Sequence, residues 1–222
     1  TAAPVLDVVK GLIPASPNLD VLKCVMIRAK DGEARVLAEN LQESISIELP
    51  CEIMEDGEVC IPGELLHSVV SRSRGDEPLH LKAKKTCVIR SGGSTSRMAV
   101  VPSEMFPEPF EGDEKRWKSW FSCPSMSLLI ALRDGGFIAS GKAGSSAQYG
   151  VTAGAGVHIS TDLSTPCVVS TDYRRLSHSE VLEAHVSHSF AYTVPAASAK
   201  IALGIVERCS EEIVFDVTDG AV

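Results

Sequence analysis

The chain lacks the features that identify several large classes of protein. No apolar run approaches the ~20 residues that a membrane-spanning helix needs. No glycine-rich phosphate-binding loop is present, and Gly154-Ala155-Gly156 lacks the third glycine of a dinucleotide-binding loop. The seven cysteines never occur at C-x-x-C spacing, which argues against a zinc site and against a disulfide framework. We therefore expect no membrane association, no cofactor and no bound metal.

Two weaker patterns, one for a metal site and one for a cysteine nucleophile, lack the neighbouring residues that either function needs. His185 and His188 lie three residues apart, but their segment reads as a loop leading into a strand and offers no further ligands. No cysteine stands in a recognisable activating environment, so we expect the cysteines to be small buried side chains in a reducing cytosol. A hydrolase with a cysteine nucleophile stays as an alternative that one unusually reactive cysteine would support.

Composition is that of an ordinary folded protein, with 44% hydrophobic and 23% charged residues. At 222 residues the chain suits one large domain or two of about 100 residues. The net charge of −8 argues against broad coating of nucleic acid, although a local basic face remains compatible with it.

Hydrophobic patterning predicts alternating helices and strands in the first half. A short helix over 2–12 precedes strands over 21–29 and 34–38, which Asp31-Gly32 joins as a hairpin turn. Further strands follow over 44–49 and 59–61. Pro62 then fits the first position of a helix with Leu65, Leu66, Val69 and Val70 as its buried stripe. Closing strands are expected over 79–84, 87–90 and 98–101.

The second half repeats this order. Strands are expected over 117–121, 148–160, 165–170, 190–194 and 213–217, with helices starting at Pro124 and Pro195. The segments 36–40 and 168–172 both end a strand in a polar turn, and 59–70 and 192–203 both read strand, proline, helix. Asn40 lies 22 residues before Pro62, and Asp172 lies 23 before Pro195. The matching separation indicates an internal duplication.

Three prolines and a charged stretch between residues 102 and 117 mark a connector between the halves. We expect an α+β fold of two similar domains, each with helices on one face of a mainly antiparallel sheet. The boundaries are residues 1–110 for the first domain, 111–116 for the linker and 117–222 for the second. Relative to this repeat, the first domain lacks a first strand and the second lacks its last strands, so the chain looks cut at both ends.

Several segments, in the same order and spacing, resemble the bacterial DNA polymerase III beta subunit, the sliding clamp family. They are RSGGSTSRMAVVPSEMFPE (90–108), VLKCVMIRAKDGEARVLAENLQESISIELP (21–50), GEVCIPGELLHSVV (57–70), VVSTDYRRLS (168–177) and YTVPAASAKIAL (192–203). Two departures matter. The family has a third domain that is absent from this chain, and Tyr173 stands where the family commonly has glycine, which could crowd the turn.

The resemblance implies a homodimeric ring, completed by the third domain, whose helices line a hole around duplex DNA. Such a ring tethers the replicative polymerase by topology and performs no chemistry. The polymerase and the clamp loader insert short peptides into a groove on the second domain. The expected location is the cytoplasm, at the nucleoid. The alternative function is a diverged clamp-like adaptor that binds partner peptides without encircling DNA.

Residue by residue, the resemblance places the groove at Thr171, Arg174, Arg175 and Leu176. Leu176 would offer an apolar floor, and Arg175 could fork toward a peptide carbonyl or carboxylate. Asp172 is expected to order the turn through its own side chain. Without the resemblance, the same residues read as a plain hairpin turn with solvated arginines.

The inner helices should carry cations aimed at phosphates, which give affinity without sequence specificity. Taken singly, each candidate reads as an ordinary solvated charge. The candidates are Lys10, Arg72, Arg74, Arg133, Lys200 and Arg208.

Overall fold

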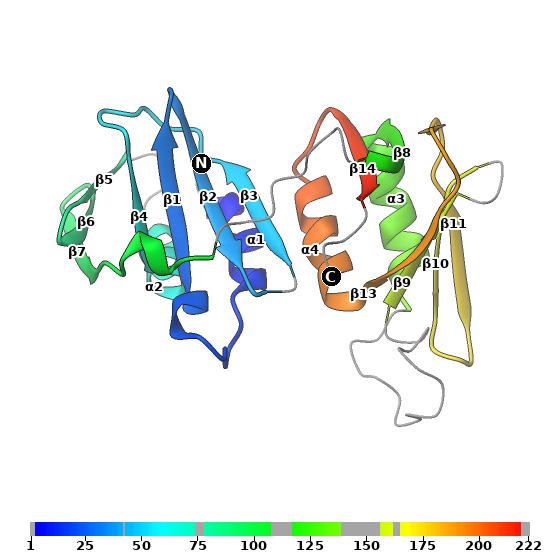
Figure 1. The fold of residues 1–222 in the computed structure, drawn as a ribbon, viewed down its shortest axis with the longest axis horizontal. Helices are drawn as coiled ribbons and strands as arrows, with labels where there is room; N and C mark the ends of the chain where they lie inside the picture. The colour runs from blue at the N-terminus through cyan, green and yellow to red at the C-terminus, as the bar shows by residue number, and fades with distance from the viewer. Residues whose placement is uncertain are drawn as a thin grey trace. The chain divides into compact units, whose positions relative to one another are not determined.

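The computed structural model describes residues 3–41, 43–73, 78–107, 117–138, 156–161 and 165–218 (Figure 1). Arg74, the expected linker 111–116 and the first part of the strand expected over 148–160 lie outside the described residues. The chain divides into two compact units, Thr1–Glu111 and Gly112–Val222, and each is described by itself.

The first unit combines two helices with two antiparallel sheets. Helix α1 (Ala3–Leu12) and a 3-10 turn (Asp20–Lys23) precede β1 (Cys24–Lys30), β2 (Glu33–Glu39), β3 (Ser44–Glu48), β4 (Gly57–Pro62) and α2 (Gly63–Arg72). Strands β5 (Leu79–Ala83), β6 (Thr86–Ser91) and β7 (Ser94–Ala99) and a second 3-10 turn (Ser103–Met105) follow. One sheet has the order β3-β2-β1-β4 and the other β5-β6-β7. Helices α1 and α2 pack on each other and on the four-stranded sheet.

The second unit has the same plan. Strand β8 (Trp117–Pro124) leads into α3 (Ser125–Gly136), followed by β9 (Gly156–Ser160), β10 (Cys167–Thr171), β11 (Leu176–Glu180) and β12 (His185–Val186). Strand β13 (Ala191–Pro195), α4 (Ala196–Val206) and β14 (Glu212–Thr218) complete it. The sheets have the orders β11-β10-β9-β13 and β12-β8-β14, and α3 and α4 pack on the four-stranded sheet.

The strand orders confirm the internal duplication and the α+β class. The orders β3-β2-β1-β4 and β11-β10-β9-β13 are equivalent, so that β1 corresponds to β9, β2 to β10, β3 to β11 and β4 to β13. The two sequence anchors fall at equivalent places. Asn40 and Asp172 both follow the second strand of the order, and Pro62 and Pro195 both end its fourth strand. Strand β11 was missed from the sequence, because its polar residues read as part of a turn.

Proline fixes the start of three helices. Pro62, Pro124 and Pro195 are the N-caps of α2, α3 and α4, with φ of −58°, −56° and −53°. The expectation that Pro62 occupies the first helical position is wrong by one residue. Its ring sets φ near the helical value and its missing N–H costs nothing at a helix start, so the strand can run through the proline directly into the helix.

Each unit has its own apolar core. In the first unit, Cys24 and Met26 of β1, Leu37 of β2 and Cys60 of β4 form one buried cluster with Phe106. In the second unit three rings stack, with centroids of Phe121 and Phe215 5.4 Å apart and those of Phe190 and Phe215 5.9 Å apart. Leu66 and Val70 bury the inner stripe of α2, whereas Leu65, expected in that stripe, is 54% exposed because it lies on the helix's outer side.

Candidate functional site

The expected groove residues lie on the tight turn between β10 and β11. The strands pair antiparallel as far as Thr171 and Leu176, and the turn closes where the Asp172 N–H donates to the Arg175 carbonyl at 3.3 Å. Tyr173 adopts φ of +68°, a left-handed conformation that costs a residue with a Cβ roughly 1–2 kcal/mol. That conformation explains physically why glycine suits this position.

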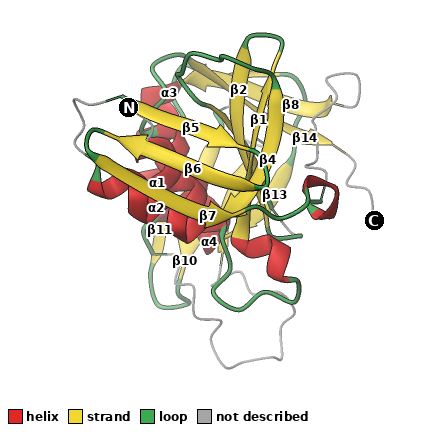
Figure 2. Ribbon diagram, turned by 90° about the vertical axis from the view of Figure 1, so that its left-hand side faces the viewer, coloured by secondary structure: helices red, strands yellow, loops and turns green. Residues whose placement is uncertain are grey.

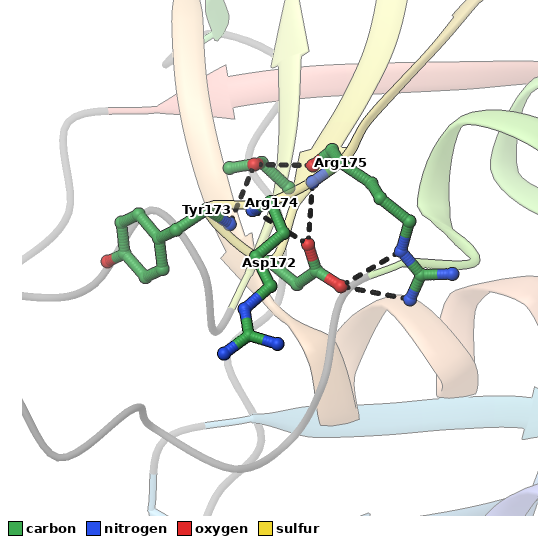
Figure 3. A network of polar contacts seen from close by, with 5 residues as sticks. Asp172, Tyr173, Arg174 and Arg175 are labelled. Atoms are coloured by element: carbon green, nitrogen blue, oxygen red, sulfur yellow. Dashed lines mark hydrogen bonds and ion pairs between the residues drawn. The ribbon is translucent and has the colours of Figure 1, made fainter.

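Two side chains close the turn from within (Figure 3). The Thr171 hydroxyl donates to the Arg175 carbonyl at 2.7 Å and accepts the Tyr173 N–H at 3.0 Å. Asp172 Oδ1 accepts the backbone N–H groups of Arg174 at 3.0 Å and Arg175 at 2.8 Å. The expectation that Asp172 orders the turn through its own side chain is confirmed. Thr171 likewise has its hydroxyl engaged inside the turn.

The guanidinium of Arg175 folds back onto the turn. Its Nε and Nη2 both donate to the same oxygen, Asp172 Oδ2, at 3.1 and 2.9 Å, in a charge-assisted contact. The Arg175 hydrogen bond, with backbone N–H groups of Arg175 and Arg174, lowers the pKa of Asp172 to about 2. The Arg175 guanidinium is therefore already bonded to Asp172 before any ligand binds.

Three side chains point outward. In Figure 3 the Tyr173 ring and the Arg174 guanidinium extend away from the hydrogen-bonded network. Tyr173 is 60% exposed and Leu176, the first residue of β11, is 68% exposed. Tyr173 and Leu176 therefore present exposed apolar side chains on either side of Arg174 and Arg175 in the sequence, and Arg174 has no ion pair among the described residues.

The hairpin is fixed to α3 by buried serines. The Ser170 hydroxyl donates to the Gly135 carbonyl at 2.6 Å, and the Ser177 hydroxyl donates to the Asp134 carbonyl. These bonds occupy carbonyls at the end of α3 that have no partner within the helix. A Cβ at Gly135 would collide with the backbone of Val168 on β10, so glycine permits this close approach. The sequence gives no signal for either tie, because each joins segments at least 35 residues apart.

The structure distributes the candidate cations over both helix pairs. Lys10 is exposed in the last turn of α1, and Arg72 in the last turn of α2 beside a cavity of about 460 Å³ that Ser73, Ser91 and Ser94 also line. Lys200 is exposed on α4. Arg74 lies outside the described residues.

Two cations of the second unit are already engaged. Arg133 on α3 pairs with Glu207, just beyond α4, at 2.7 Å. Arg208 donates to the carbonyl of Gly204 at the end of α4. Both contacts hold helix ends together, so these two residues have a structural role beside any contact with DNA.

The cysteines differ in their surroundings, and the hydrogen bond from the Cys60 thiol lowers the pKa of the buried Cys24 thiol. Five are buried, as expected, but Cys51 and Cys209 are exposed. Burial raises the pKa of Cys87, and raises that of Cys123 to about 11, which disfavours the reactive thiolate. The neighbouring Cys24 thiol and burial raise the pKa of Cys60. Within the described part of the chain, no group of three His, Cys, Asp or Glu side chains could hold a metal ion, and no helix is long and apolar enough to cross a membrane.

Two tandem units, each with a helix pair on a four-stranded antiparallel sheet, form the fold of a DNA sliding clamp. Sliding clamps from Pseudomonas aeruginosa and Bartonella birtlesii, both bound to griselimycin, each match with a TM-score of 0.78 and 17% identity over 96% of this chain and 56% of theirs. A putative DNA polymerase III beta subunit from Eubacterium rectale matches with a TM-score of 0.77 and 17% identity, over 98% of this chain and 57% of that one.

The sequence supports the same assignment for the first unit. Residues 3–109 match the family model of the DNA polymerase III beta subunit, N-terminal domain. The first unit therefore belongs to the family of the DNA polymerase III beta subunit N-terminal domain. No curated protein matches the chain. The chain spans little more than half the length of the solved clamps that it resembles.

Proposed function

We propose that the chain acts in DNA replication as two domains of a ring that encircles duplex DNA and performs no chemistry itself. The duplicated strand order of the two units carries this proposal, because repeated units can be arranged around a duplex without reading its sequence. The ring would be a homodimer completed by a third domain, located in the cytoplasm at the nucleoid.

The proposed partner site is the β10–β11 turn. Leu176 supplies exposed apolar area, and Arg174 supplies a guanidinium that no described acidic residue neutralises. Thr171 and Arg175 hold the turn in shape, and Arg175 could exchange Asp172 for a carboxylate or carbonyl of the peptide. The replicative polymerase and the clamp loader would bind here through short peptides with apolar and acidic residues.

The proposed DNA-facing cations are Lys10, Arg72, Arg74, Arg133, Lys200 and Arg208, and those that the structure describes lie on or next to the helices. Their contacts with phosphates would be weak and sensitive to salt, which suits a protein that slides. Since Arg133 and Arg208 are engaged within the second unit, Lys10, Arg72 and Lys200 should contribute more.

The test uses the full-length protein, loaded by its clamp loader onto a nicked circular plasmid and washed in high salt. The plasmid is then cut once, and the retained protein is measured again. Retention through the wash followed by loss after linearisation would show that topology holds the protein on DNA. Equal loss from circle and line would contradict encirclement and favour the adaptor that only binds partner peptides.

A further inference from the structure

The three-stranded sheet β5-β6-β7 of the first unit has an unusual charge distribution. Residues 78–103 contain no aspartate or glutamate but five lysines and arginines, in a chain whose net charge is −8. The basic residues are Lys82, Lys84, Lys85, Arg90 and Arg97. Figure 2 views the molecule with these strands toward the reader.

The strand register places three of these cations on one face. His80 pairs with Arg90 and Lys82 with Val88, and across the next strand Arg90 pairs with Thr95 and Val88 with Arg97. Paired residues share a face, so His80, Lys82, Arg90 and Arg97 lie together on one side. The opposite side carries Cys87, Ile89 and Met98, which are buried.

The cationic face is open to solvent. His80, Lys82, Arg90, Thr95 and Arg97 are all exposed, and Lys84 and Lys85 are exposed in the turn between β5 and β6. Among the described residues, no carboxylate pairs with any of these five lysines and arginines. In the register, Lys82 and Arg97 each lie opposite Val88, and Arg90 lies opposite His80 and Thr95, so the three cations are diagonal neighbours on one face. A group of like charges with no carboxylate partner among the described residues suits an external anion.

We propose that this face binds the phosphate backbone of duplex DNA, as a surface separate from the helices. Its chemistry favours that occupant over a protein, because Val88 is its one large aliphatic side chain and is half-buried, whereas protein interfaces rely on apolar and aromatic anchors. The face has no Phe, Tyr or Trp, and His80 is its one aromatic ring, so it lacks the series of rings on which successive unpaired bases stack, which disfavours single-stranded nucleic acid.

The size of the face sets the expected strength. From His80 on β5 to Lys84 in the turn that follows, four steps of about 3.3 Å span roughly 13 Å. One strand of a duplex carries a phosphate every ~3.4 Å of its axis, so about four phosphates lie opposite the face. Binding that neutralises about four phosphates should weaken on the order of 100-fold between 50 and 200 mM salt.

The experiment measures the affinity of the full chain for a short, linear, fluorescent duplex by anisotropy across that salt range. The patch variant combines Lys82→Gln, Arg90→Gln and Arg97→Gln. A matched control, Lys23→Gln with Lys30→Gln and Arg35→Gln, removes the same charge elsewhere in the first unit. We expect the patch variant to bind at least 10-fold more weakly at 50 mM salt, with a log–log salt slope reduced by about 3, while the control stays close to wild type.

Several outcomes would overturn the proposal. They are wild-type affinity in the patch variant, equal weakening in the control, or no binding of the wild type at 50 mM salt. Tighter binding to phosphatidylserine vesicles than to the duplex would assign the face to a lipid surface instead. Loss of affinity only in a helix variant, Lys10→Gln with Arg72→Gln and Lys200→Gln, would also overturn it. That last result would leave encirclement intact, since plasmid retention tests encirclement independently of this face.

Discussion

The described residues of the two equivalent turns have a similar backbone geometry, but the turns differ in the side chains that they present. In the first unit the Leu41 N–H donates to Glu39 Oε1 at 2.6 Å, and Leu41 has φ of +72°. In the second the Tyr173 N–H donates to Thr171 Oγ1 at 3.0 Å, and Tyr173 has φ of +68°. The turn's shape therefore belongs to the repeated fold and is no evidence of a binding site by itself.

The side chains carry the difference. The first turn is closed by Asn40, whose amide donates to Glu43 at 3.0 Å and whose Oδ1 accepts the Glu43 N–H at 2.8 Å. The second is closed by Asp172 and Arg175, and Leu176 stands where the first unit has Ser44. The first turn has Glu43 followed by Ser44, whereas the second has Arg175 at the equivalent position, followed by the exposed Leu176. That contrast supports placing the partner site in the second unit alone.

The largest expected effect is a mutation that destabilises the second unit and leaves the first unit folded. Gly135→Ala places a methyl group against the Val168 backbone, and we expect a loss of about 2–3 kcal/mol in the free energy of unfolding. Gly136→Ala is the control, because its nearest neighbour, Val157 Cγ2, lies at 3.4 Å. Hydrogen exchange should show lost protection in the second unit only. Equal loss in the first would mean that the units unfold together.

Partner binding should distinguish the two turns next. Leu176→Ala in the full-length protein should weaken binding of a fluorescent peptide carrying a replicative polymerase's clamp-binding motif at least 10-fold, about 1.4 kcal/mol or more. Leu41→Ala removes a similarly exposed side chain from the equivalent turn and should leave the affinity unchanged. If both variants bind like wild type, the β10–β11 turn is only a hairpin, as its counterpart is.

How much the sequence could reveal depended on whether the signal was local. Asp31-Gly32 predicted its hairpin, and the structure gives these residues φ of +53° and +87°. Pro62 and Pro195 predicted their helix starts to within one residue. These features are set by neighbouring residues, so a sequence pattern suffices to predict them.

Features that join distant segments could not be read from the sequence. The ties from Ser170 to α3 and from Arg133 to Glu207 span 35 and 74 residues. Strand β11 was hidden because it is an edge strand whose Ser-His-Ser core lacks apolar alternation. At the candidate site, the family resemblance supplied the residues, whereas the pairing of Arg175 with Asp172 emerged only from the folded turn.

Backbone strain should be equal in the two turns. Tyr173→Gly and Leu41→Gly each remove the cost of a Cβ at positive φ but add entropy to the unfolded chain, so each should stabilise by about 0.5–1 kcal/mol. Chemical denaturation measures both. Tyr173→Ala, which keeps the Cβ and removes the exposed ring, should have no such benefit. Destabilisation by Tyr173→Gly alone would reveal packing of the Tyr173 ring that its exposure does not suggest.

The smallest expected effect comes from exchanging Asp172 and Asn40, the equivalent residues that close the two turns, and measuring the melting temperature against pH. The pKa of Asp172 is lowered to about 2, below its usual value near 3.9, so its ion pair stabilises the folded chain above pH ~4. That stabilisation is lost as the pH falls through about 2. Asp172→Asn, which copies the first turn, should therefore lower the melting temperature slightly at pH 6 and lose that difference near pH 2. Asn40→Asp should do the same for the opposite reason, because it sets a carboxylate beside Glu43 that acid neutralises. A pH-independent difference for Asp172→Asn would mean that hydrogen bonding, and not charge, closes the second turn.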